Sequence, residues 1–83
     1  MIDKKKIPLW LRLTPARERA LMYSILKEYR QWARIQDVAE KLNITPYLCH
    51  QYSQHFHESG LLDIGPDGYL LKPEYIKEVD NEF

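Results

Sequence analysis

The five prolines divide the 83-residue sequence into segments that can be helical and segments that cannot. Inside a helix, proline removes a backbone hydrogen bond and clashes with the preceding turn, but it is well tolerated at the first helical position. Pro8 therefore argues against a helix at the start of the chain, and Pro66 lies between two short apolar runs, as prolines in turns do. The other three stand before runs of helical periodicity and are predicted to open helices: Pro15, Pro46 and Pro73.

The first predicted helix follows a basic arm and a short apolar segment over residues 9–13, which is expected to be extended. The helix is predicted over residues 15–31, with Thr14 as its N-cap. Its apolar side chains recur at the spacing of one helical face: Leu21, Met22, Ile25, Leu26 and Tyr29.

The middle of the chain predicts two further helices joined by a tight turn. A short helix over 36–42 is expected to end at Asn43, because asparagine tolerates the left-handed conformation that ends many helices. A longer helix over 46–59 is expected to be capped by Thr45 and to end at Gly60. Two short helices joined by three to four residues form a helix-turn-helix.

A β-hairpin is predicted after these helices. Strands over 61–64 and 69–72 flank the sequence GPDG, which fits a type I turn whose last glycine takes a positive φ. A last helix is predicted to begin at Pro73, with three apolar residues on one stripe: Ile76, Val79 and Phe83.

One stretch thus contains, in order, a short helix, a turn, a longer helix, a glycine and a hairpin: IQDVAEKLNITPYLCHQYSQHFHESGLLDIGPDGYLL. This order resembles the winged helix-turn-helix family of DNA-binding domains, and VAEKLNIT followed by a helix and SGLL is similar to small bacterial and archaeal regulators. The resemblance implies a mainly α (α+β) fold with a three-helix core, a two-stranded hairpin wing and a short C-terminal helix. It divides the chain into an N-terminal arm (1–13), the winged domain (14–72) and a C-terminal helix and tail (73–83).

The resemblance also implies a function, sequence-specific binding of double-stranded DNA by a small transcriptional regulator. In this family the second helix of the pair lies in the major groove and the wing lies at the minor groove or the backbone. Four polar side chains of this helix are thereby implied to contact bases: Tyr47, His50, Gln51 and Gln54. Glutamine can read adenine through two hydrogen bonds.

Charge is distributed unevenly along the chain. Residues 1–34 contain nine Lys or Arg and three acids, a net charge of +6, whereas residues 35–83 contain three Lys and nine acids, a net charge of −6. Such polarity suggests a basic face aimed at an acidic partner. DNA-backbone contacts are therefore expected from the following side chains: Lys4, Lys5, Lys6, Arg17, Arg19, Arg34, Thr45 and His57. The 46–59 helix has no Lys or Arg, and its exposed histidines are expected to supply positive charge only by gaining protons near pH 6.

A second hypothesis is a protein–protein interaction module that does not bind DNA. The 46–59 helix is rich in His and Tyr, and tyrosine and tryptophan are favoured at protein interfaces. Two apolar segments without an evident place in a minimal core also predict a homodimer, with these interface residues: Trp10, Leu11, Ile76, Val79 and Phe83.

The sequence argues against several other classes of protein. A single cysteine, Cys49, excludes an internal disulfide and fits a reducing cytoplasm. No apolar run reaches the roughly 18 residues of a membrane span. His50 and His57 are separated by about 10.5 Å along a helix and cannot share a metal ion. Without a glycine-rich phosphate loop, paired acids or a Ser/His/Asp arrangement, no enzyme, cofactor, metal or small-molecule ligand is expected.

Overall fold

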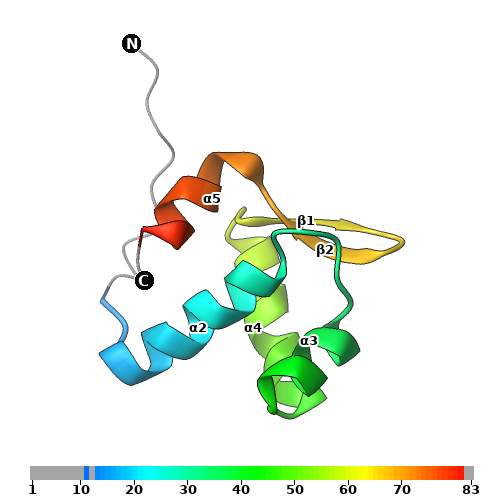
Figure 1. Cartoon of the computed structure of the whole chain (residues 1–83), viewed down its shortest axis with the longest axis horizontal. Coiled ribbons are helices and arrows are strands. Elements are labelled where there is room, and N and C mark those ends of the chain that lie inside the picture. The colour runs from blue at the N-terminus through cyan, green and yellow to red at the C-terminus, as the bar shows by residue number, and fades with distance from the viewer. Residues whose placement is uncertain (1–10, 12, 82–83) are drawn as a thin grey trace.

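The computed structural model describes residues 11 and 13–81, and the structural statements below concern this part of the chain. It contains, in order, α2 (Ala16–Glu28), α3 (Ile35–Leu42), α4 (Pro46–Glu58), β1 (Leu62–Gly65), β2 (Gly68–Leu71) and α5 (Pro73–Asp80). The antiparallel hairpin extends to one side of the helices, and α5 packs against α2 (Figure 1). The expected mainly helical chain with one hairpin and a C-terminal helix is confirmed. No helix in this described part is long and apolar enough to cross a membrane.

The turn between α3 and α4 is built as the sequence predicts. Asn43 is left-handed, with φ of 57°, and the Ile44 N–H donates to the carbonyl of Ala39 at 3.0 Å. This bond gives a hydrogen-bond donor to a carbonyl at the end of α3, and the left-handed Asn43 ends the helix. The side-chain oxygen of Thr45 then accepts the N–H of Leu48 at 3.1 Å, which satisfies a free donor at the start of α4.

The end of α4 is also of the predicted kind, with a glycine of positive φ. Gly60 has φ of 85°, and its N–H donates to the carbonyl of His57 at 3.0 Å. The Leu61 N–H donates to the carbonyl of Phe56 at 2.9 Å, so Leu61 belongs to this helix end. As a result, β1 begins at Leu62, one residue later than predicted.

The start of α2 differs from the prediction. Pro15 has ψ of 143°, which is not helical, so it takes the N-cap position expected for Thr14 and the helix begins at Ala16. The helix ends at Glu28 rather than at residue 31. The extended segment predicted over 9–13 is wrong where the structure describes it, because Leu11 is helical and its carbonyl accepts the Thr14 N–H at 3.2 Å. Proline restricts the residue before it and not those after it, so a helical turn can follow Pro8.

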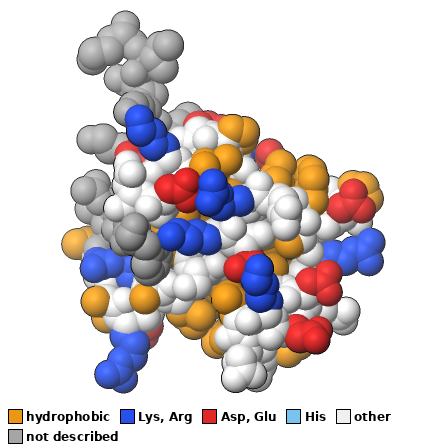
Figure 2. All heavy atoms as spheres, viewed as in Figure 1, with side chains coloured by type: hydrophobic (Ala, Val, Ile, Leu, Met, Phe, Trp, Pro, Cys, Tyr) orange, Lys and Arg blue, Asp and Glu red, His pale blue; other side chains and the backbone are white. Residues whose placement is uncertain are grey.

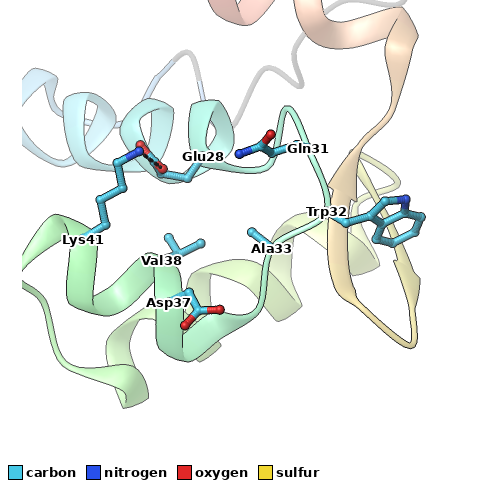
Figure 3. Close-up of a pocket in the computed structure, with 7 residues that line it drawn as sticks. All are labelled: Glu28, Gln31, Trp32, Ala33, Asp37, Val38 and Lys41. Atoms are coloured by element: carbon cyan, nitrogen blue, oxygen red, sulfur yellow. Dashed lines mark ion pairs between the residues drawn. The ribbon is translucent and has the colours of Figure 1, made fainter.

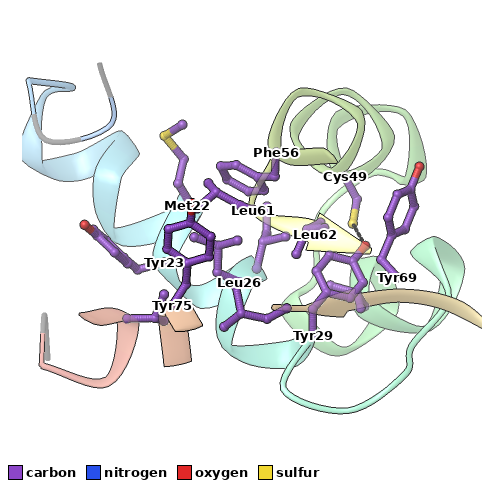
Figure 4. Packing of buried hydrophobic residues seen from close by; sticks show 14 of the residues in the cluster. Met22, Tyr23, Leu26, Tyr29, Cys49, Phe56, Leu61, Leu62, Tyr69 and Tyr75 are labelled. Atoms are coloured by element: carbon purple, nitrogen blue, oxygen red, sulfur yellow. Dashed lines mark hydrogen bonds between the residues drawn. The ribbon is translucent and has the colours of Figure 1, made fainter. Parts of the chain in front are cut away.

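The core lies where the four helices α2, α3, α4 and α5 meet the hairpin (Figure 4). Leu11 and Val79 are both 0% exposed, and Ile76 packs against the same cluster. Where α5 packs on α2, the apolar surface of Leu11 and Val79 is thus covered within one chain, and that of Ile76 is partly covered. The dimer interface at these three residues stays a prediction. The other two predicted members, Trp10 and Phe83, lie outside the described residues.

A buried polar cluster joins α2 to α4. The Tyr29 hydroxyl lies 2.6 Å from Oγ of Ser53 and 4.0 Å from Sγ of Cys49. Burial raises the pKa of Tyr29 and also that of the Cys49 thiol. Cys49 is 0% exposed, which confirms its predicted place in the core.

The hairpin is attached to the helices by backbone hydrogen bonds that the sequence did not predict. Ala33, in the connector between α2 and α3, donates its N–H to the carbonyl of Tyr69 at 3.1 Å and accepts the Tyr69 N–H at 2.8 Å. The Leu71 N–H donates to the carbonyl of Tyr29 at 2.7 Å. A Cβ atom on Gly68, whose φ is 114°, would lie 2.0 Å from the carbonyl oxygen of Ala33. Only glycine therefore fits at this contact.

Candidate nucleic-acid interface

Helix α4 has one face in the core and one in solvent. Cys49, Ser53 and Phe56 are 0% exposed and form the buried stripe. The four side chains predicted to contact bases are all exposed: Tyr47, His50, Gln51 and Gln54. At the start of the same helix, Thr45 is exposed, and its hydroxyl proton can still be donated while its oxygen accepts the capping bond. The structure thus brings these polar side chains together on the outer side of one helix.

Two residues of this outer face are bonded to each other. Gln51 donates an Nε2 hydrogen to the hydroxyl oxygen of Tyr47 at 2.8 Å, across one helical turn. The Gln51 amide keeps its second N–H and its carbonyl oxygen, and the Tyr47 hydroxyl keeps its proton. The pair therefore presents two donors and one acceptor to whatever approaches this face.

One flank of α4 faces the hairpin. The ring of His57 lies 6.0 Å from the ring of Tyr69 on β2, at an interplanar angle of 63°. His57 is half-buried, which corrects the prediction that it is exposed. His50 lies two helical turns earlier on the same flank and remains exposed.

The predicted DNA-backbone contacts are spread over several elements. Arg34 is exposed at the N-cap of α3, and Arg17 is exposed near the start of α2, with Arg19 half-buried beyond it. The starts of α2 and α3 lie at opposite sides of the molecule (Figure 1), so these arginines do not form one patch. Three of the predicted contacts lie outside the described residues: Lys4, Lys5 and Lys6.

The elements around the outer face of α4 carry net negative formal charge. With histidine neutral, α3 and α4 each sum to −1, and residues 62–71 sum to −2 because they contain Asp63 and Asp67 and no Lys or Arg. Lys41 of α3 is paired with Glu28 of α2 at 3.0 Å. In Figure 2, acidic and basic side chains are intermixed on the visible face instead of forming one basic surface. The predicted phosphate contacts Arg17, Arg19 and Arg34 therefore lie on α2 and at the start of α3 and not on α4 or the hairpin.

A hollow of about 230 Å³ lies between the end of α2, α3 and their connector (Figure 3). Its lining residues are Glu28, Gln31, Trp32, Ala33, Asp37, Val38 and Lys41. The indole of Trp32 points away from the hollow toward the hairpin (Figure 3), where its Cη2 would lie 3.1 Å from a Cβ on Gly65. None of the predicted DNA contacts lines this hollow.

Sequence reasoning missed two residues that position the candidate interface. Ala33 fixes the hairpin beside α4 through its two bonds to Tyr69, and Ser53 bonds the inner face of α4 to Tyr29. The available signal for Ser53 was its position, four residues after Cys49 on the apolar stripe. For Ala33, the only signal in the sequence was Gly68, because a glycine can allow another backbone segment to approach closely.

Among residues 11 and 13–81, no group of three or more His, Cys, Asp or Glu side chains is placed to hold a metal ion. Models of known protein families gave no match to this sequence, and neither did a search of curated proteins.

Proposed function

We propose that this protein binds double-stranded DNA as a winged helix-turn-helix domain, with α4 in the major groove and the hairpin as the wing. The observation that supports this most is the outer face of α4, where exposed polar side chains lie on a helix that follows a three-residue turn. The major groove is about 12 Å wide and admits such a helix. The amides of Gln51 and Gln54 are of the type that reads base edges.

The charges favour binding that is weak. Each neutralised phosphate contributes about 0.9 to the slope of log affinity against log salt concentration. Since α4 and the hairpin have no Lys or Arg, few such contacts come from the elements nearest the groove. Arg17, near the start of α2, and Arg34, at the N-cap of α3, are exposed arginines that would add such contacts. We therefore expect a shallow salt dependence and a low affinity, which is highest at low ionic strength.

We also propose that two copies act together on one DNA site, as a small transcriptional regulator in the cytoplasm. Two copies double the number of weak contacts, and a two-fold pair would read half-sites about 34 Å apart. Because Leu11 and Val79 are buried within one chain, little of their surface is free for contacts between the copies. Sedimentation with and without DNA tests this: a complex containing a single chain under all conditions would contradict it.

Docking of another protein is the second candidate function, and the hairpin is the observation that favours it. Ile64 on β1 is 59% exposed, and Asp63 and Asp67 are exposed beside it. Acidic side chains at the tip of a wing would repel phosphates, whereas an apolar side chain with an acidic rim suits a protein surface.

A mobility-shift experiment at low salt with a random pool of double-stranded DNA separates the two functions. Replacing Gln51 and Gln54 together by alanine should abolish sequence preference, and Arg34→Ala should weaken binding to all sequences. Gln31→Ala is the matched control, because Gln31 is an exposed glutamine in the connector and not on α4. If the wild-type chain shifts no DNA even at low salt, DNA binding is wrong and protein docking is favoured.

A further inference from the structure

We infer that Tyr47 is a positioning residue whose hydroxyl holds the amide of Gln51 in place to read the adenine of an A·T pair. The inference rests on the proposed DNA binding and assigns one base preference to one pair of side chains. It is carried by the 2.8 Å hydrogen bond from Nε2 of Gln51 to the Tyr47 hydroxyl. Both residues are exposed, and Tyr47 is 70% exposed, so the bond lies where DNA would approach.

The bond restrains the position of the Gln51 side chain. An exposed glutamine otherwise rotates freely about its side-chain torsions. The contact with Tyr47 holds the Gln51 amide against the Tyr47 hydroxyl, one helical turn away. Because a hydroxyl can accept from the amide nitrogen or donate to the amide oxygen, it fixes where the amide lies and not the order of its two polar atoms. The place of the amide on the outer face is therefore set before DNA binds.

The groups that remain on Gln51 match adenine. On its major-groove edge, adenine has an acceptor at N7 and a donor at its N6 amino group. The free N–H of Gln51 can donate to N7, and its carbonyl oxygen can accept from the amino group. Guanine presents acceptors at both N7 and O6, so the glutamine oxygen would face another acceptor. The chemistry thus selects A·T over G·C at this position.

Gln54 provides a comparison within the same face. It is the same residue type on the same exposed side of α4, but no side-chain hydrogen bond of Gln54 occurs among the described residues. An unheld side chain loses rotational freedom when it binds, and this loss weakens affinity about three- to tenfold per side chain. Gln51 has lost part of that freedom already. Removing the Tyr47 hydroxyl should therefore reduce affinity by up to that factor through Gln51 alone.

The test compares Tyr47→Phe, Gln51→Ala, the double variant and the control Gln54→Ala. Preferred sites are selected from a random pool of double-stranded DNA with each protein, and affinities are measured on the wild-type site. We expect Tyr47→Phe to lose up to about tenfold in affinity, with a weakened adenine preference at the position that Gln51→Ala also affects. The double variant should bind as Gln51→Ala does, and Gln54→Ala should alter a different position. Thermal unfolding of all four variants checks that the fold is intact.

A modified base gives a second, independent measurement. In 7-deazaadenine a C–H group replaces N7, so the acceptor for Gln51 is lost while the base pair is kept. With this base at the assigned position only the bond to the N6 amino group remains, so the difference in affinity between wild type and Tyr47→Phe should become smaller. An unchanged adenine preference in Tyr47→Phe, or losses that add in the double variant, would overturn the inference while DNA binding stands. If wild type enriches no DNA at all, the proposed function fails and the inference fails with it.

Discussion

The two faces of α4 are held in place by different forces, although their residues alternate along one short sequence. On the inner face, Cys49, Ser53 and Phe56 have no exposed surface and are fixed by contacts with other elements. On the outer face, the hydrogen bond between Gln51 and Tyr47 lies within the helix itself. Stability therefore depends mainly on the inner face, and the proposed recognition of DNA depends on the outer face. Substitutions should therefore change one property without the other.

The largest effect is expected from Phe56→Ala on the inner face. Removing this buried ring should lower the free energy of unfolding by about 3–5 kcal/mol, because the lost contacts leave a cavity. Gln54→Ala on the outer face should change it by less than about 0.5 kcal/mol. Urea denaturation of both variants measures the contrast. Similar losses in the two variants would show that the faces are not separated as described.

A smaller loss is expected when the buried polar cluster is broken. Ser53→Ala removes the 2.6 Å partner of the Tyr29 hydroxyl and should cost about 1–3 kcal/mol, because a buried polar group loses its hydrogen bond. Adding Tyr29→Phe to the Ser53→Ala background should restore part of this loss, since the polar groups are then removed together. Stability losses that simply add in the double variant would contradict the pairing.

Thr45 is the exposed N-cap of α4, and its substitution should have an intermediate effect. Thr45→Ala removes the acceptor for the Leu48 N–H and should cost roughly 1 kcal/mol. Thr45→Ser keeps the oxygen and should retain most of the stability. If serine and alanine destabilise the protein equally, the capping bond does not contribute and the loss has another cause.

The smallest effect concerns the pH dependence of the inner face. Burial raises the pKa of the Cys49 thiol in the folded chain, so the unfolded chain loses this proton first. The stability from this group is complete below its unfolded pKa of about 8.5 and declines as pH rises beyond it. The free energy of unfolding should therefore fall less between pH 8 and 10 in Cys49→Ala than in wild type. In the same range, a thiol reagent should label native Cys49 much more slowly than the urea-unfolded chain.

Local signals in the sequence predicted most of the element boundaries to within one residue. The hydrogen bonds of Asn43, Thr45 and Gly60 are made to residues within a few positions in the sequence. Their roles can therefore be predicted from the local sequence. The outer face of α4 was likewise predicted, because it consists of the polar residues that lie opposite the apolar stripe of the helix. The Gln51–Tyr47 bond could also have been predicted, because residues four apart are neighbours on a helix.

Contacts between distant segments could not be read in this way. Leu11 and Val79 are apolar in the sequence, but only the folded chain shows that they pack within one copy. The partial burial of His57 depends on where Tyr69 lies, and this depends in turn on the bonds between Tyr69 and Ala33. The DNA-binding role of the outer face of α4 stays a prediction, because it depends on a partner molecule and not on the chain alone.

The bonds between Ala33 and Tyr69 have a mechanical consequence. Strand β2 is bonded on one side to β1 and on the other to the backbone of the connector that leads into α3. A force on the hairpin tip would therefore be transmitted through the main chain to the start of α3, and from there to the turn that orients α4. In hydrogen exchange, the amides of Tyr69 and Leu71 should exchange together with the helical core, because their acceptors are carbonyls of Ala33 and Tyr29. A displacement of the hairpin tip would thus be coupled to the orientation of α3 and α4.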